Sequence, residues 1–185
     1  MFEEGFSEQG LVRQRLLEQR RILVSGPLES GSITSLTAQL MMLDGVSSRD
    51  VEVVVNSSGG PLSEIFSVLD VIEVMRAQVS ITCIGEAIGT AAGLVACGSG
   101  ERQAARHARL SLRCDGRQSF EGTAAEVAHE ADQLAALRNR YIDVLTAATG
   151  QGRQPTADEV DRGSTLSAAE ALTLGLIDTV IKPGS

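Results

Sequence analysis

Two continuously apolar strands, each ending in a tight glycine turn, constrain the fold of this chain more than any other feature. Residues 51–55 are rich in valine and lead into Asn56-Ser57-Ser58-Gly59-Gly60. Residues 79–84 form the second such run and lead into a turn of small residues that ends at Gly93. Apolar residues at helical spacing lie between the two strands, at residues 62–75. Continuous apolar strands that alternate with helices are typical of a parallel sheet, so we predict an α/β fold.

The remaining elements follow the same alternation. A short β-rich run covers residues 22–24, and the helical pattern of residues 33–43 is expected to end at Asp44-Gly45. Three capping-box pairs predict helix starts, and the chain closes on an expected short strand at residues 180–181. The capping-box pairs are Thr123 with Glu126, Thr156 with Glu159 and Ser167 with Glu170.

Composition excludes several classes of function. A chain of 185 residues is long enough for one domain with a substantial core, and its net charge of −8 argues against nucleic acid as a partner. No stretch is long and apolar enough to span a membrane, and the acidic start lacks a signal peptide, so we expect a cytoplasmic protein. Cys83, Cys97 and Cys114 are an odd count at wide spacing, which indicates reduced thiols. We expect no cofactor and no metal site.

The two strand–turn units, at this separation, resemble those of the ClpP family of serine peptidases, the proteolytic subunits of the Clp protease. Further matches lie at Gly100-Glu101-Arg102, Thr149-Gly150-Gln151 and Leu166-Ser167-Ala168, so the resemblance covers nearly the whole chain. It implies a ClpP/crotonase-like fold of repeated β-β-α-type units, with a mainly parallel sheet covered by helices. It also implies an N-terminal axial-loop-like segment at residues 1–19, partly mobile, and a single domain at residues 20–185 with a strand–helix handle at about residues 111–150.

The catalytic triad of the family carries over onto three residues that cannot perform its chemistry. The nucleophilic serine falls on Gly89, the general-base histidine on Arg113 and the orienting aspartate on Gly163. A glycine offers no nucleophile, and an arginine stays protonated and cannot act as a base. The two histidines of the chain, His107 and His129, have no sequence reason to replace the missing base.

Two further sites are implied by the resemblance. The backbone N–H groups of Gly60 and Thr90 fall on the oxyanion-hole donors, which do not depend on side-chain identity. In the family, tyrosines help to build a docking cleft for ATPase loops, and the matching positions in this chain are Glu52 and Val54. A carboxylate in an apolar cleft costs desolvation, so docking of a AAA+ unfoldase is expected to be weak or altered.

The handle implies assembly. In the family this region interlocks two rings, so the resemblance implies heptameric rings stacked in pairs, built from this chain, from active paralogues, or from both. The apolar residues of the long helix after Thr123 are the expected contact residues. Of these, we expect Val127, Leu134, Leu137 and Tyr141 to form the contacts between subunits.

Three functions therefore stay open. The first is a non-catalytic ClpP-like subunit that assembles into rings and modulates an active serine peptidase. The second is a crotonase-like enzyme that uses the backbone oxyanion hole, with Glu86 or Asp115 as acid or base. The third is a residual serine endopeptidase that has recruited another serine. The serines near the relevant turns are Ser57, Ser58, Ser99 and Ser111.

Overall fold

A seven-stranded sheet organises the protein, and all but one of its strand pairs are parallel. The structure is a computed structural model that describes residues 8–114 and 123–182. The path through the sheet is β1-β2-β3-β4-β7, while β5 pairs with the end of β3 and, antiparallel, with β6. The strands are β1 (Arg21–Ser25), β2 (Val51–Ser57), β3 (Val79–Ile88), β4 (Arg102–Ala105), β5 (Arg109–Ser111), β6 (Leu166–Ser167) and β7 (Thr179–Ile181).

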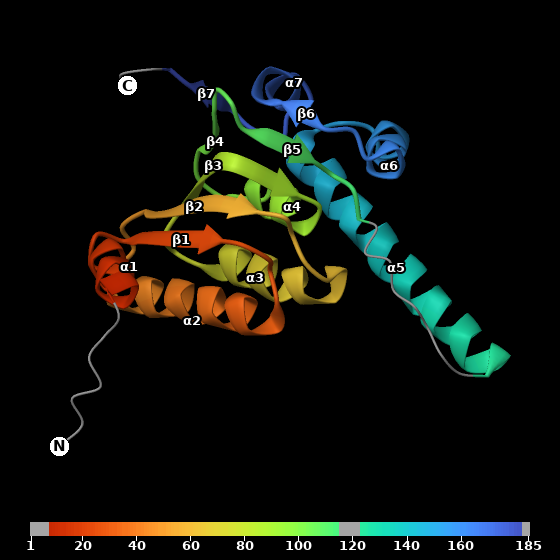
Figure 1. Ribbon diagram of the computed structural model, residues 1–185, viewed down its shortest axis with the longest axis horizontal. Coiled ribbons are helices and arrows are strands. Elements are labelled where there is room, and N and C mark those ends of the chain that lie inside the picture. The colour runs from red at the N-terminus through yellow and green to blue at the C-terminus, as the bar shows by residue number, and fades with distance from the viewer. Residues whose placement is uncertain (1–7, 115–122, 183–185) are drawn as a thin grey trace.

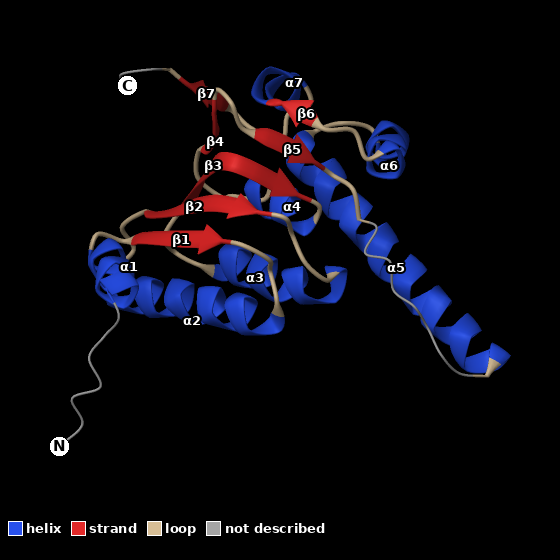
Figure 2. Ribbon diagram, in the orientation of Figure 1, coloured by secondary structure: helices blue, strands red, loops and turns tan. Residues whose placement is uncertain are grey.

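Helices cover the sheet, which confirms the predicted α/β class. In Figure 1, α2, α3 and α4 lie on the same side of strands β1 to β3, and α5 runs away from the sheet so that its N-terminal end lies farthest out. Figure 2 shows the same separation of helical and strand layers. The helices are α1 (Glu8–Glu18), α2 (Ser30–Val46), α3 (Leu62–Val74), α4 (Thr90–Ala96), α5 (Ala124–Thr149), α6 (Arg153–Arg162) and α7 (Ala168–Thr173).

The burial of β2 shows which face of the sheet carries the core. Val51, Val53 and Val55 are at most 1 % exposed and pack in the same core as the apolar residues of α2 and α3. The alternate residues Glu52 and Val54 are only partly buried, on the opposite face. The apolar run of residues 51–55 is therefore buried on one face only, whereas a strand of this composition is typical of a sheet covered on both.

Several boundaries differ from the sequence-based expectation. α2 continues through Asp44-Gly45 to Val46. α6 begins at Arg153, so the Thr156 hydroxyl lies inside the helix and donates to the carbonyl of Gly152 at 3.0 Å; the predicted capping box at Thr156 is wrong. The boxes at Thr123 and Ser167 are confirmed.

The N-terminal segment contains a helix that the sequence analysis did not predict. α1 covers most of the stretch expected to be axial-loop-like and partly mobile, and its Leu17 packs against the core. Leu11 and Val12 on the same helix are more than half exposed. Residues 1–7 lie outside the described residues, so the expectation for that part of the segment stays a prediction.

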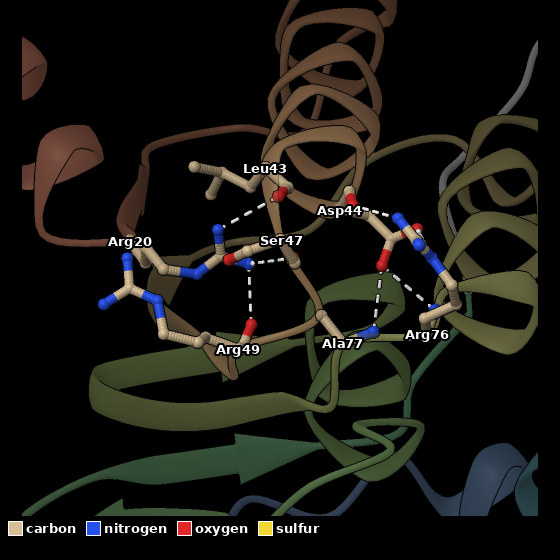
Figure 3. Close-up of polar contacts among 7 residues, drawn as sticks. All are labelled: Arg20, Leu43, Asp44, Ser47, Arg49, Arg76 and Ala77. Carbon is tan, nitrogen blue, oxygen red and sulfur yellow. Dashed lines mark hydrogen bonds and ion pairs between the residues drawn. The ribbon is translucent and has the colours of Figure 1, made fainter.

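Arg20 determines how α2 ends. Its side chain is buried and its backbone has a φ of 60°, a value that non-glycine residues seldom adopt. As Figure 3 shows, the guanidinium reaches the loop after α2. It donates to the carbonyl oxygens of Leu43, Ser47, Arg49 and Asp50, at 2.6–3.1 Å. The guanidinium thus binds one carbonyl of the last turn of α2 and three of the loop that follows, and acts as a C-terminal cap supplied from another element.

Asp44 fixes the same end of α2 to the loop before β3. Its carboxylate accepts the backbone N–H groups of Ala77 and Arg76 at 2.9 and 3.0 Å (Figure 3). The bond from Ala77, then that from Arg76, holds the pKa of Asp44 below its usual value, against the opposing effect of desolvation. Asp44 thus belongs to a tertiary contact, which explains why it does not terminate the helix.

Arg102 links three chain segments at the opposite edge of the sheet. Its Nη1 donates to the carbonyl oxygens of Ala96, Ala148 and Gly175 at 2.9–3.1 Å, at the ends of α4 and α5 and just after α7. Asp178 holds the guanidinium in place, with Nε to Oδ2 at 2.9 Å. A cation at converging helix C-termini is stabilising because the helix dipoles leave negative charge there.

Within residues 8–114 and 123–182, no helix is both long enough and apolar enough to cross a membrane. In the same ranges, His, Cys, Asp and Glu side chains do not gather in groups of three or more that suit a metal ion.

Candidate active site

The turn from β3 into α4 places Gly89 where the resemblance puts the nucleophile. Gly89 has φ 59° and ψ −122°, in the range that only glycine adopts without strain. Its N–H donates to the carbonyl of Ser111 at 2.7 Å, and its carbonyl accepts the hydroxyl of Tyr141 at 2.9 Å. The turn is therefore held from β5 on one side and from α5 on the other.

Gly89 also lies against the backbone of Arg113. A Cβ at position 89 would meet the Arg113 carbonyl oxygen at 2.7 Å, a distance that real Cβ atoms essentially never show. A serine here would need both the strained backbone and a shift of the segment after β5. The site as folded accommodates glycine and excludes a side-chain nucleophile at the turn.

Gly163 completes a group of three neighbours. It ends α6 in the left-handed conformation, with φ 58° and ψ 34°. A Cβ at position 163 would lie 3.2–3.3 Å from Cβ, Cγ and Cδ of Arg113, so the arginine stem fills the space beside the glycine. Gly89, Arg113 and Gly163 thus come together in space although the chain separates them widely, as the resemblance to a triad implies.

One of the two donors of the expected oxyanion hole, the N–H of Gly60, is already bonded within the protein. The N–H of Gly60 donates to Oγ1 of Thr90 at 2.8 Å, and the same hydroxyl donates to the carbonyl of Gly60 at 3.1 Å. Thr90 is only 3 % exposed, whereas Gly60 is exposed, so this pair of bonds is partly buried. The Gly60 donor that a developing oxyanion requires is already satisfied in the resting structure.

A pocket of about 480 Å³ lies over these residues. The turn of residues 58–62 forms one wall, residues 88–90 the second, and Arg113, Cys114 and Leu134 close it. The described residues that line the pocket include no histidine, aspartate or glutamate, and hence no side chain suited to act as a general base at neutral pH.

Neither histidine approaches the pocket lining. His107 is exposed on the turn between β4 and β5. His129 is exposed on α5, where its ring lies in hydrogen-bond contact with Gln133 at 2.8 Å. The structure does not bring either ring to Gly89.

The alternative serines serve local structure. Ser57 Oγ accepts the N–H of Gly59 at 3.1 Å, and Ser99 Oγ accepts the N–H of Val79 at 2.9 Å. Ser111 Oγ donates to the carbonyl of Gly163 at 3.3 Å, while Ser58 lines the pocket. These bonds are those of turns and strand ends.

The candidate acids and thiols give no catalytic arrangement either. Glu86 pairs with Arg109 at 3.4 Å and does not line the pocket, while Asp115 lies outside the described residues. Burial raises the pKa of Cys83 and of Cys97 to about 12, so both thiols stay protonated. Cys114 lines the pocket with its Sγ 3.5 Å from the carbonyl of Leu112.

The expected docking cleft is polar on this chain. Glu52 pairs with Arg21, with Nε to Oε2 at 2.6 Å, on the less buried face of the sheet. The hollow beside it, of about 420 Å³, is lined mainly by polar and charged side chains, and Val54 does not line it. The ion pair is partly solvated, so an apolar segment that docked here would have to strip water from both charges.

The handle prediction needs one correction. Val127, Leu134 and Leu137 lie along α5 and are partly exposed, as contact residues should be. Tyr141 is fully buried, so it cannot form an intersubunit contact; it packs inside the subunit and donates to Gly89. Gly93 makes room for it, since a Cβ there would lie 2.3 Å from the Tyr141 hydroxyl. Burial raises the pKa of Tyr141 well above its usual value, which keeps the phenol a donor.

Comparisons with known proteins agree with this geometry. A family model described as Clp protease matches residues 6–184. The chain is 32 % identical to a protein named ATP-dependent Clp protease proteolytic subunit 1 from Nocardia farcinica (strain IFM 10152), over 93 % of this chain and 88 % of the relative. It is 28 % identical to the protein of the same name from Thermobifida fusca (strain YX), over 90 % of this chain and 76 % of the relative. The sheet order, the glycine turns and these matches together show that the chain belongs to the Clp protease family.

Proposed function

We propose that this chain is a non-catalytic member of a Clp-type protease complex, which assembles into rings and modulates an active serine peptidase. One observation carries the proposal: Gly89, Arg113 and Gly163, onto which the resemblance carries the family's triad, lie together in the structure, and none of them supplies a nucleophile, a base or an orienting carboxylate. Arg113 packs against both Gly89 and Gly163, so the three residues fit together without a triad.

Assembly is supported by the shape of the subunit. The N-terminal half of α5 projects beyond the sheet (Figure 1), and Val127, Leu134 and Leu137 are partly exposed along it. A projecting helix with an apolar stripe is suited to pack against another subunit. The two relatives named above are proteolytic subunits by name. We propose that this chain joins itself or active paralogues through α5, in heptameric rings stacked in pairs.

Unfoldase docking through this subunit is proposed to be weak. The support is the Glu52–Arg21 ion pair on the less buried sheet face and the polar lining of the hollow beside it. In a mixed ring, such a subunit leaves ATPase contact to its active neighbours. The subunit then contributes to the structure of the ring. We also propose that the protein is located in the cytoplasm.

The structure favours neither of the other two functions. A crotonase-like oxyanion hole requires the Gly60 N–H, which Thr90 occupies, and Glu86 is paired away from the pocket. A recruited serine requires a base, and the described pocket lining contains none.

Labelling with a fluorophosphonate probe tests the absence of catalysis. The wild-type protein is expected to remain unlabelled under conditions in which an active family member is labelled fully. Variants Ser58→Ala and Ser111→Ala provide the matched set, since they remove the serines nearest Gly89. Robust labelling of the wild type at any serine would overturn the proposal, and loss of that labelling in either variant would identify the serine.

A further inference from the structure

A cavity of about 910 Å³ lies between α3 and α5 and takes no part in the candidate active site. Residues 96–100, at the end of α4, line it as well. Among the described residues, it shares no lining residue with the pocket over Gly89. Small-ligand sites usually have volumes of about 300–1,000 Å³, so this cavity admits a whole small molecule.

Much of the cavity wall is apolar. Phe66, Leu69 and Ile72 of α3 line it and are at most 8 % exposed. Val144 of α5 and Cys97 after α4 are partly buried against the same core. Burial raises the pKa of Cys97 to about 12, so the thiol stays neutral. These walls suit a ligand with an apolar body.

The positive charges at the cavity are balanced within the protein. Three arginines line it, and each is paired with a carboxylate. The pairs are Arg76 with Asp44, Arg102 with Asp178 and Arg140 with Asp70. The guanidinium of Arg140 also lies over the ring of Phe66, 4.2 Å from its centroid. The cavity therefore has no uncommitted arginine that would favour an anion.

Glu73 is the charged lining residue without such a partner. Among the described residues, its exposed carboxylate takes part in no hydrogen bond or ion pair. Glu73 lies in the last turn of α3, and that turn contains no basic residue. The C-terminal end of a helix carries partial negative charge, so a carboxylate there is unfavourable unless a cation lies beside it. The uncompensated charge at this cavity is therefore negative.

We propose that this cavity binds a small organic cation, in which an ammonium or amidinium group is carried on an apolar body. The cation pairs with Glu73 at the end of α3, and the apolar body packs on Ile72, Cys97 and Val144. Binding is non-covalent and uses a site separate from Gly89. It goes beyond the proposed function, because it requires neither catalysis nor its absence.

Fluorescence titration with two dansyl probes tests the inference. In the first probe, a five-carbon chain joins the dansyl group to a primary amine; in the second, that amine is acetylated and carries no charge. The wild type is expected to bind the amine about three- to tenfold more tightly, as for a partly solvated ion pair that also compensates a helix end. Glu73→Gln should make the two affinities equal. This variant removes a carboxylate from a helix C-terminus, so it is expected to fold at least as well as the wild type.

Matched controls separate recognition by Glu73 from general electrostatics and locate the bound probe. Glu130→Gln removes another exposed carboxylate, on α5, that does not line the cavity, and it should leave the preference for the amine unchanged. Ala147→Trp enlarges an exposed side chain that lines the cavity, so it should weaken the binding of both probes. Circular dichroism and thermal unfolding check that each variant is folded.

Four outcomes would contradict the inference. They are equal affinity of the wild type for the two probes, no binding of either probe at millimolar concentration, a preference that Glu73→Gln retains, and binding that Ala147→Trp leaves unchanged. Each of them leaves the proposed function standing, because fluorophosphonate labelling tests the absence of catalysis separately. Labelling of the wild type would overturn the proposed function and leave the cation site standing.

Discussion

At the scale of the residue, the geometry of the turn at Gly89 disfavours a serine at this position. The backbone there is in a region that costs a non-glycine residue about 1–3 kcal/mol, and the Arg113 carbonyl occupies the space of a Cβ. A serine would face both costs and would find no base. On the proposed function, the glycine at position 89 and the close packing of the turn therefore belong together.

We predict that Gly89→Ser lowers the free energy of unfolding by about 1–3 kcal/mol and gives no peptidase activity. Gly45→Ser is the matched control, since Gly45 lies exposed within α2 with open space around it and has no left-handed backbone. That control should change the free energy of unfolding by less than about 1 kcal/mol. Urea denaturation and a fluorogenic peptide assay measure both effects; cleavage by Gly89→Ser would contradict the account of the site.

Gly163 and Arg113 are predicted to be coupled. Gly163→Ala should be destabilising by about 1–2 kcal/mol from its left-handed backbone alone, and further from contact with the arginine stem. Arg113→Ala removes that stem, so the same substitution should cost less in the double variant.

A double-mutant cycle by urea denaturation measures this coupling, which we expect to be about 0.5–3 kcal/mol. Strict additivity of the two substitutions would show that the packing between the stem and Gly163 carries no energy.

At the scale of the element, two arginines, one buried and one partly buried, cap helices from a distance. Arg20 caps α2, and Arg102 reaches carbonyls at the ends of α4 and α5 and after α7. Such caps are invisible to local sequence rules. Asp44-Gly45 reads as a helix end, yet α2 continues because tertiary partners satisfy its last turn. Local caps were predictable where both members lie within four residues, as at Thr123 and Ser167.

We predict that Asp178 contributes to acid sensitivity. Its hydrogen bond from the Arg102 side chain is the main cause that lowers the pKa of Asp178 below its ordinary 3.8. A carboxyl group with a lowered folded-state pKa stabilises the protein above the unfolded value and loses that contribution as pH falls below it. Asp178→Asn should therefore lower the free energy of unfolding at pH 7 and flatten its decline below about pH 4.

Urea denaturation at a series of pH values tests this prediction. Asp158→Asn is a control, because Asp158 lies exposed on α6, where its carboxylate accepts a hydrogen bond from the side chain of Gln154 at 2.8 Å. An Asp178→Asn curve parallel to that of the wild type would show that the Arg102 pair has no part in the pH dependence.

At the scale of the whole molecule, the sequence predicted the architecture better than the contacts of the candidate site. The glycine turns and β-branched strands placed Gly60, Gly89 and the mainly parallel sheet correctly, because these signals are local. The Thr90 bonds to Gly60, the stem of Arg113 against Gly163 and the burial of Tyr141 depend on residues that only the fold brings together. The sequence analysis did not connect Gly93 with Tyr141, which the fold brings into contact.

The native mass of the purified protein, alone and mixed with an active family member from the same organism, tests the central claim most directly. We predict a ring-sized species that contains this chain, either by itself or together with the active subunit. The triple variant Val127→Asp, Leu134→Asp and Leu137→Asp should reduce that species, because it places charge on the partly exposed stripe of α5. A stable monomer or dimer that ignores the active subunit would contradict a role in a Clp-type complex.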